Sequence, residues 1–139
     1  MSTTATPGLA RISVGLLILL ALLTALDAIA IDMYLPAMPA IAHSFAVDAG
    51  RIQHTLSVFL AGLAIGQALY GPLLDRYGRR APLMVGMLLF IAGSAASALS
   101  TSPEMLTLAR FVQALGAAAG LVTPRAIVSD ICSVTESSK

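Results

Sequence analysis

Four long apolar runs constrain this chain more than any other feature of its sequence. Each run is long enough to cross the ~30 Å hydrocarbon core of a bilayer as a helix of about 20 residues. The expected spans cover residues 12–34, 49–74, 81–99 and 103–128. Because 58% of the residues are hydrophobic and 11% are charged, an ordinary water-soluble domain is excluded. The sequence therefore predicts an all-α membrane protein with four transmembrane helices.

The first apolar run has a second interpretation, as a cleavable secretory signal peptide. Arg11 precedes the run, and Ala28-Ile29-Ala30 is a small-residue pattern typical of cleavage sites. Its 20 apolar residues exceed the ~7–15 of a signal core, however, and three more spans follow. We therefore expect this run to be kept as the first membrane helix.

The distribution of cations predicts the orientation of the spans. Residues 1–11 and 129–139 form short polar tails at the two ends. On one predicted side of the membrane lie Arg11, Arg76, Arg79, Arg80, Arg125 and Lys139. Arg51 is the cation expected on the other side. Because Lys and Arg are enriched in cytoplasmic loops, both termini are predicted to be cytoplasmic.

The loop between the second and third spans has a specific pattern. Residues 71–80 read Gly-Pro-Leu-Leu-Asp-Arg-Tyr-Gly-Arg-Arg, with three cations and one anion. This pattern resembles the signature loop of the major facilitator superfamily, which joins the second and third helices of those transporters. The matching positions are Gly71, Asp75, Arg76, Gly78, Arg79 and Arg80. Leu74 departs from the pattern, since the family usually has a small residue there.

The end of the first span resembles one branch of this superfamily in particular. Residues 32–37, Asp-Met-Tyr-Leu-Pro-Ala, are similar to the bicyclomycin-resistance-type branch of drug:proton antiporters. The resemblance implies a proton-coupled exporter of small organic compounds in the bacterial inner membrane. Such transporters contain two six-helix bundles, so the chain is expected to be partial and to act with further helices or another chain. Pro36 is expected to end the first helix, with a linker following as far as Asp48.

The fourth span contains two arginines that are too close together to lie at opposite membrane surfaces. The 14 residues between Arg110 and Arg125 cover only ~21 Å as a helix, and Arg125 can reach the nearby surface with its long side chain. Arg110 is therefore predicted to lie inside the membrane, on one helix face with Gln113 and Gly120. Residues 110–120 resemble the fourth-helix motif of the superfamily, which implies a role for Arg110 in proton coupling.

An arginine at this depth needs a partner, and the first span offers two acids. Asp27 lies about 10 Å below Tyr34, and Arg110 about 9 Å below Glu104, at 1.5 Å per residue. These depths predict a salt bridge between Asp27 and Arg110. Asp32 lies ~140° around the helix from Asp27 and carries the family resemblance. We expect one carboxylate to bind and release a proton in competition with substrate. The alternative is a salt bridge that only fixes helix packing.

Other residues have predicted structural roles or exclude functions. Gly62 and Gly66 form a GxxxG step for close helix packing, a role also expected of Gly116 and Gly120.

The net charge of +1, the absence of Trp and the single cysteine, Cys132, give no sign of a nucleic-acid partner, a disulfide, a metal site or a cofactor. No residue set indicates an enzyme. A small four-helix oligomeric exporter and a non-transporting membrane interaction protein remain as alternative functions.

Overall fold

The computed structural model describes residues 13–136, with side chains as far as Asp130, and this part of the chain is helical without strands. The helices are α1 (Val14–Asp32), α2 (Tyr34–Ser44), α3 (Ala49–Tyr77), α4 (Arg80–Ala98) and α5 (Pro103–Glu136). By length and composition, α1, α3, α4 and the Pro103–Asp130 part of α5 can each cross a membrane. The predicted all-α fold with four spans is thus confirmed.

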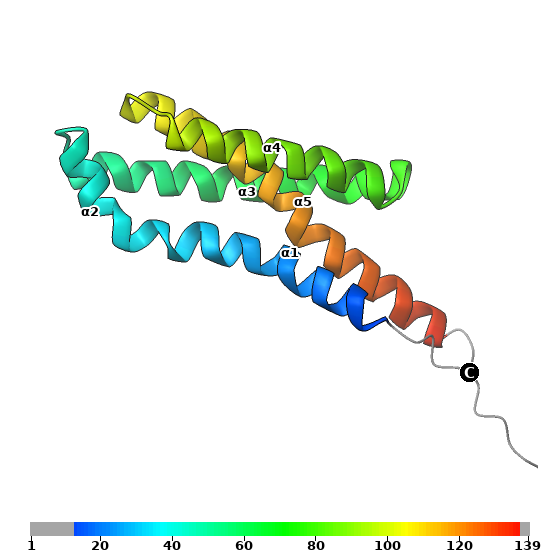
Figure 1. Cartoon of the computed structure of the whole chain (residues 1–139). Coiled ribbons are helices and arrows are strands. Elements are labelled where there is room, and N and C mark those ends of the chain that lie inside the picture. Colours follow the sequence, from blue (N-terminus) through cyan, green and yellow to red (C-terminus); the bar gives the residue numbers. More distant parts are fainter. Residues whose placement is uncertain (1–12, 137–139) are drawn as a thin grey trace, which may run out of the picture.

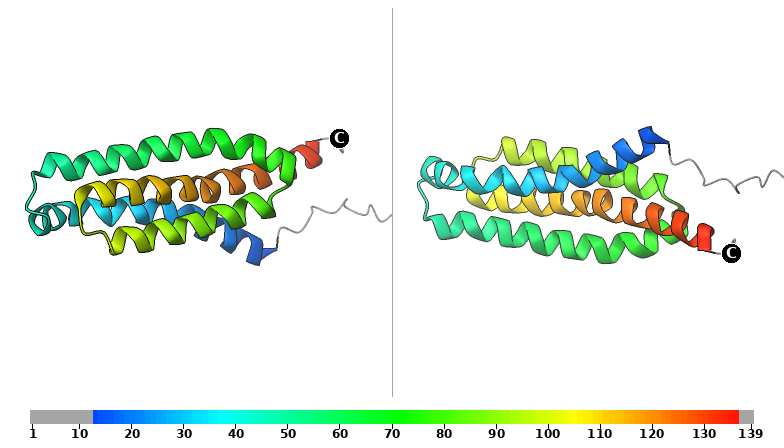
Figure 2. Two further views of the ribbon diagram at one scale, coloured as in Figure 1. Left: turned by 90° about the horizontal axis from the view of Figure 1, so that it is seen from above. Right: turned by 90° about the horizontal axis from the view of Figure 1, so that it is seen from below.

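Helix α5 occupies the centre of the bundle. It lies between α3 and α4 and also packs against α1, as the three views in Figures 1 and 2 show. Inside the bundle, 56% of the α5 span is buried, against 17% to 22% of the other three spans. Side chains on α5 are therefore the ones best placed to meet residues from several helices at once.

Small residues allow α5 to take this central position. Its buried face includes Ala114, Ala117, Ala118 and Ala119. On α3, a Cβ atom added to Gly66 would come within 2.5 Å of the Ala118 Cβ, so the two helices touch at their smallest side chains. Lipid offers no hydrophobic drive for helix association, and close van der Waals contact of this kind supplies the cohesion instead.

Helix α2 is the main departure from the predicted organisation. Residues 35–48 were expected to form a linker, which is wrong: a break at Met33 is followed by the 11-residue helix Tyr34–Ser44. Pro36 is compatible with this helix because it lies in the first turn, where its missing N–H group has no intrahelical partner to lose. Tyr34 packs with Ala42 of the same helix and Ile52 of α3, so α2 closes one end of the bundle, called the α2 end below.

The remaining connections follow local sequence signals. The Asp48 carboxylate accepts a hydrogen bond from the Gly50 N–H at 2.9 Å and caps α3. The Ser102 hydroxyl accepts one from the Met105 N–H at 3.2 Å and caps α5. Gly78 makes the turn between α3 and α4 at φ 77°, a backbone conformation that side chains disfavour.

The predicted ends of the second and fourth spans differ from the structure, and α3 continues to Tyr77, past the expected residue 74. Helix α5 continues to Glu136, past the expected end at residue 128, so part of the predicted cytoplasmic tail is helical. Arg11 and Lys139, on which part of the orientation argument rests, lie outside the described residues. The side chain of Cys132 also lies outside the described part.

Candidate functional site

The centre of the bundle holds a buried arginine between two aromatic rings. Arg110 of α5 is only 4% exposed. Its guanidinium lies 4.0 Å from the centroid of the Tyr34 ring of α2 and 4.3 Å from that of the Phe59 ring of α3. Both distances are within the ~6 Å range of cation–π attraction, which gains strength where water is excluded. We call Arg110, Tyr34 and Phe59 the arginine cage.

Hydrogen bonds attach the guanidinium to two further helices. Its Nη1 atom donates to the Gln113 Oε1 atom at 2.9 Å, and Nη1 and Nη2 both approach the Ala30 carbonyl oxygen of α1 at 3.4 Å. The Gln113 Nε2 atom donates in turn to the Ser94 hydroxyl of α4 at 2.8 Å. Arg110 and Gln113, predicted to share one face, are therefore direct partners. Through them α5 is connected to α1 and α4.

The tyrosine of the cage is itself held in place. Its hydroxyl is hydrogen-bonded to the hydroxyl of Thr55, which is fully buried on α3. The Thr55 hydroxyl also donates to the Ile52 carbonyl oxygen at 2.6 Å. A buried hydroxyl normally needs such partners, and here they fix the ring that covers the guanidinium.

The predicted salt bridge between Asp27 and Arg110 is not formed. Asp27 is 5% exposed, and neither carboxylate oxygen has a hydrogen-bond partner among the described residues. Its surroundings on α1, α4 and α5 are almost wholly apolar and include Leu23, Met87 and Phe90. The space between these side chains leaves no room for a water molecule. Asp27 is therefore a buried acid without a neutralising group.

The error came from the depth assigned to the two residues. Tyr34 was used as the membrane-surface reference for the first span, but it is buried in the arginine cage, and the chain continues beyond it as α2. Asp27 consequently lies deeper, beside Gly116 and Gly120 of α5. These glycines are six and ten residues along α5 from Arg110, about 9 and 15 Å at 1.5 Å per residue.

Asp32, the second predicted acid, takes a different position. It is the last residue of α1, directly before the break at Met33, and its side chain is exposed. The structure thus brings Arg110 and Gln113 together and separates both from Asp27. Tyr34, Phe59, Ala30 and Ser94 were missed as partners of this group. Tyr34 was noticed in the sequence but interpreted as a surface anchor, and a backbone carbonyl such as that of Ala30 leaves no sequence signal.

The signature loop lies at the opposite end of the bundle from α2 and holds its own charge cluster. The Arg79 side chain forms an ion pair with Asp130 of α5 at 2.6 Å and lies 3.9 Å from Asp75 of α3. Arg76 lies over the Tyr77 ring at 5.6 Å. The loop is therefore connected to α5 as well as to the helix before it.

The glycines predicted to serve packing differ in how close their neighbours lie. A Cβ atom on Gly62 would lie 3.0 Å from the Ala114 Cβ, and one on Gly116 only 2.3 Å from the Phe90 backbone nitrogen. Around Gly120 the nearest such atom is the Leu23 carbonyl oxygen at 3.4 Å, and Gly71 has open space. Close packing thus depends on Gly62, Gly66 and Gly116 much more than on Gly120.

The site contains two chemically different groups, which lie at different depths in the helix bundle. One is a permanent cation held by aromatic rings, an amide and a backbone carbonyl, with no acid opposite it. The other is a carboxyl group that is buried without a partner, a situation in which the anion is far more costly than the neutral acid. Within the described residues, no group of His, Cys, Asp and Glu side chains has the geometry of a metal site.

Comparison with known proteins shows to which protein family the chain belongs. The sequence profile of the Major Facilitator Superfamily matches residues 20–139. The chain belongs to this superfamily, and it is a multi-pass membrane protein. No solved structure matches it at a significant level.

The relatives agree with the branch suggested by the sequence. The chain is 44% identical over 125 residues to an uncharacterized MFS-type transporter, YdgK, of Bacillus subtilis, covering 90% of this chain and 31% of that protein. It is 42% identical over 113 residues to a chloramphenicol resistance protein of Pseudomonas aeruginosa, covering 81% and 27%. It is also 33% identical over 120 residues to a bicyclomycin resistance protein homolog of Haemophilus influenzae, covering 86% and 30%. The chain thus spans about a third of the length of these relatives.

Proposed function

We propose that this chain provides the four-span coupling region of a proton-driven exporter of small organic compounds in the bacterial inner membrane. The substrate class is suggested by the names of two relatives, which refer to resistance against chloramphenicol and bicyclomycin. Because the chain spans about a third of these proteins, the complete substrate path is expected to need further helices.

The observation that carries this proposal is a pair of buried ionisable side chains, one acidic and one basic, that do not contact each other. Asp27 lies without a partner in an apolar crevice, while Arg110 is held by the cage and by Gln113. Ionisable groups inside a membrane are costly and typically mark ion or proton pathways. In the proposed cycle, Asp27 carries the proton in the closed arrangement and releases it when movement of α1 admits water. On the α5 side of the α1–α5 contact, Arg110 stays positively charged.

The charge distribution favours one orientation. Arg76, Arg79 and Arg80 lie at the signature-loop end of the bundle, and Arg51 lies at the α2 end. Since positive charge accumulates on the cytoplasmic side, we place the signature loop inside the cell and α2 outside. With Cys132 replaced by serine, a cysteine introduced at Tyr77, which is 63% exposed within the loop, would then react with an impermeant thiol reagent only in everted vesicles.

A transport assay with two proteins tests the proposed function. The first is the chain as it stands, and the second is a chimera in which it replaces the aligned residues of the chloramphenicol resistance protein of Pseudomonas aeruginosa. Each is expressed in cells sensitive to chloramphenicol, and substrate-induced proton release is followed in everted vesicles. We expect release from the chimera, and its loss with Asp27→Asn.

The matched control is Thr24→Val, which changes a polar residue one turn away on α1. The Thr24 hydroxyl donates only to the Leu20 carbonyl oxygen of its own helix, at 3.0 Å. This variant is expected to retain proton release. A correctly inserted chimera that neither exports compound nor releases protons would contradict the proposal, as would full coupling in Asp27→Asn.

A further inference from the structure

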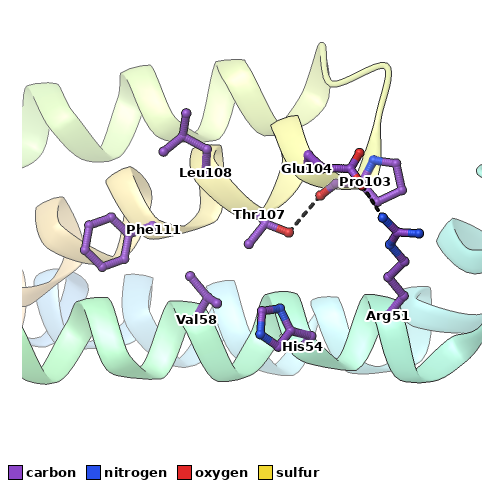
Figure 3. Close-up of a pocket in the computed structure, with 8 residues that line it drawn as sticks. All are labelled: Arg51, His54, Val58, Pro103, Glu104, Thr107, Leu108 and Phe111. Carbon is purple, nitrogen blue, oxygen red and sulfur yellow. Dashed lines mark hydrogen bonds and ion pairs between the residues drawn. The ribbon is translucent and has the colours of Figure 1, made fainter.

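A groove at the α2 end of the bundle, separate from the arginine cage, has the features of a ligand site. It lies between α3 and α5 and has a volume of about 500 Å³. That volume is within the ~300–1,000 Å³ range of sites for small-molecule ligands. Figure 3 shows Arg51 and His54 of α3 and Glu104 of α5 toward one end, and Val58, Leu108 and Phe111 toward the other.

We infer that this groove binds a membrane phospholipid whose headgroup carries a primary ammonium, namely phosphatidylethanolamine. The phosphate lies on Arg51 and His54, the ammonium on Glu104, and the upper part of an acyl chain follows Val58, Leu108 and Phe111. The inference rests on the order of these side chains along the groove and goes beyond the proposed transport function.

The order of polar and apolar residues matches the order of chemical groups in a lipid. From Arg51 to Val58 the chain advances seven residues, about 10 Å along a helix. The charged part of the groove lies at the first turns of α3 and α5, and the apolar part lies deeper in the spans. Both helices begin here, so the positive ends of their dipoles also favour a phosphate group.

The charges in the groove select the headgroup. Arg51 and Glu104 form an ion pair across the mouth of the groove, and their side chains are 60% and 64% exposed. An exposed pair of this kind contributes at most ~1 kcal/mol, so a zwitterion can replace it at small cost. The guanidinium can bind a phosphate through two N–H groups, and an ammonium can donate to the carboxylate. A choline headgroup has no N–H donor, and an anionic headgroup without an amine would place its charge beside Glu104.

Fluorescence quenching by brominated lipids tests this inference in the complete 139-residue chain. The chain contains no tryptophan, so a single introduced one reports on its own surroundings. Leu108→Trp places the reporter at the rim of the groove, and Leu88→Trp places a control on α4. The two leucines are matched in exposure, at 66% and 65%. Each variant is reconstituted in mixed bilayers of phosphatidylethanolamine and phosphatidylcholine, with one lipid brominated at a time.

The expected result is a preference confined to the groove. At residue 108, the relative binding constant is expected to favour phosphatidylethanolamine at least about threefold, and at residue 88 it is expected to be close to one. Glu104→Gln, which removes the negative charge opposite the ammonium, is expected to abolish the preference. Arg51→Gln with Glu104→Gln is expected to give the same loss, with unchanged helix content by circular dichroism.

A label-free measurement covers the possibility that a tryptophan at residue 108 disturbs the groove. Native mass spectrometry of the unmodified chain, released from the same lipid mixture, is expected to retain phosphatidylethanolamine, and Glu104→Gln is expected to retain less. Equal quenching at residues 108 and 88 would overturn the inference, because it indicates ordinary surrounding lipid. A preference that survives in Glu104→Gln would also overturn it, as would a reporter at residue 108 that no brominated lipid quenches, since protein would then fill the groove.

Discussion

Along its contact with α4, helix α5 brings backbone against backbone, whereas along its contact with α1 it holds polar side chains between the two helices. At the α4 side, a Cβ atom on Gly116 would lie 2.5 Å from the Gly86 carbonyl oxygen, and one on Gly93 would lie 2.5 Å from the Gln113 nitrogen. At the α1 side, the guanidinium of Arg110 reaches the Ala30 carbonyl oxygen only at 3.4 Å.

This difference indicates which part of the bundle can move. Backbones in direct contact resist sliding, because any shift creates overlap or empty space. A contact made by side chains can be rearranged at lower cost. Asp27 and Arg110, the acidic and basic residues that are buried in the described part of the chain, both lie at the contact of the second kind. Under the proposed function, the groups that change their surroundings during transport would therefore lie at the looser of these two contacts.

Among the substitutions that test the difference between the two contacts, a change at Asp27 is expected to have the largest effect. Asp27→Leu replaces an unpartnered acid by an apolar side chain, so it is expected to raise the free energy of unfolding by about 1–3 kcal/mol. In the chimeric transporter the same change is expected to lower proton-coupled export at least about tenfold, because the buried carboxyl group is lost. Unfolding in mixed micelles followed by circular dichroism gives the first value, and transport in vesicles gives the second. A destabilised variant would show that Asp27 has a partner.

The next largest effect is expected from Arg110→Lys. An ammonium keeps the charge but lacks the planar fork that meets Gln113 and the two rings together. Losing charged hydrogen bonds of this kind is expected to cost about 2–3 kcal/mol of unfolding free energy. Stability within 0.5 kcal/mol of the unmodified chain, a difference within the ordinary range for surface changes, would show that the cage does not hold the guanidinium.

Gly116→Ala tests the tight contact between α4 and α5. The added Cβ atom would lie 2.3 Å from the Phe90 nitrogen, so α4 and α5 must separate, at an expected cost of about 1–3 kcal/mol. Gly120→Ala is the matched control, since its nearest neighbour is at 3.4 Å and the contact is ordinary. Equal costs for the two variants, measured by the same unfolding experiment, would mean that the α4 and α1 contacts are equally tight.

The smallest effect is expected from Tyr34→Phe. This change removes the hydrogen bond to Thr55 but leaves a ring over Arg110, so about 1 kcal/mol of unfolding free energy should be lost. Tyr34→Leu also removes the ring and is expected to cost more. If both variants lose the same amount, the ring contributes nothing to holding the guanidinium.

Much of the fold could be predicted because it depends on local signals. The four spans follow from apolar length, the cap at Asp48 from residue type, and the burial of Arg110 from its distance along the helix to Arg125. Helix α2 could not be predicted in this way. Pro36 and Pro39 favoured a helix end, and only packing of Tyr34 against α3 makes a further helix stable.

Which site residues share one helix face could be predicted, but contacts between site residues on different helices could not. Gln113 was identified because it lies one turn from Arg110 on the same face. The pairing of Arg110 with Asp27 failed because it required the vertical offset between α1 and α5. That offset is set by how the small residues of α5 fit against the neighbouring helices, which no count along a single helix can give.

The small-residue face of α5 has a consequence for how a transporter of this design can diversify. Ala118 and Ala119 are fully enclosed, the first against Gly66 of α3 and the second against Gly86 of α4, so a larger side chain at either position disturbs the neighbouring helix. Large side chains on α1, such as Ile18, Leu22 and Ile29, are 51% to 60% exposed and can be exchanged without repacking the interior. The sequence of α1 can therefore vary on its exposed face while the central helix keeps its own.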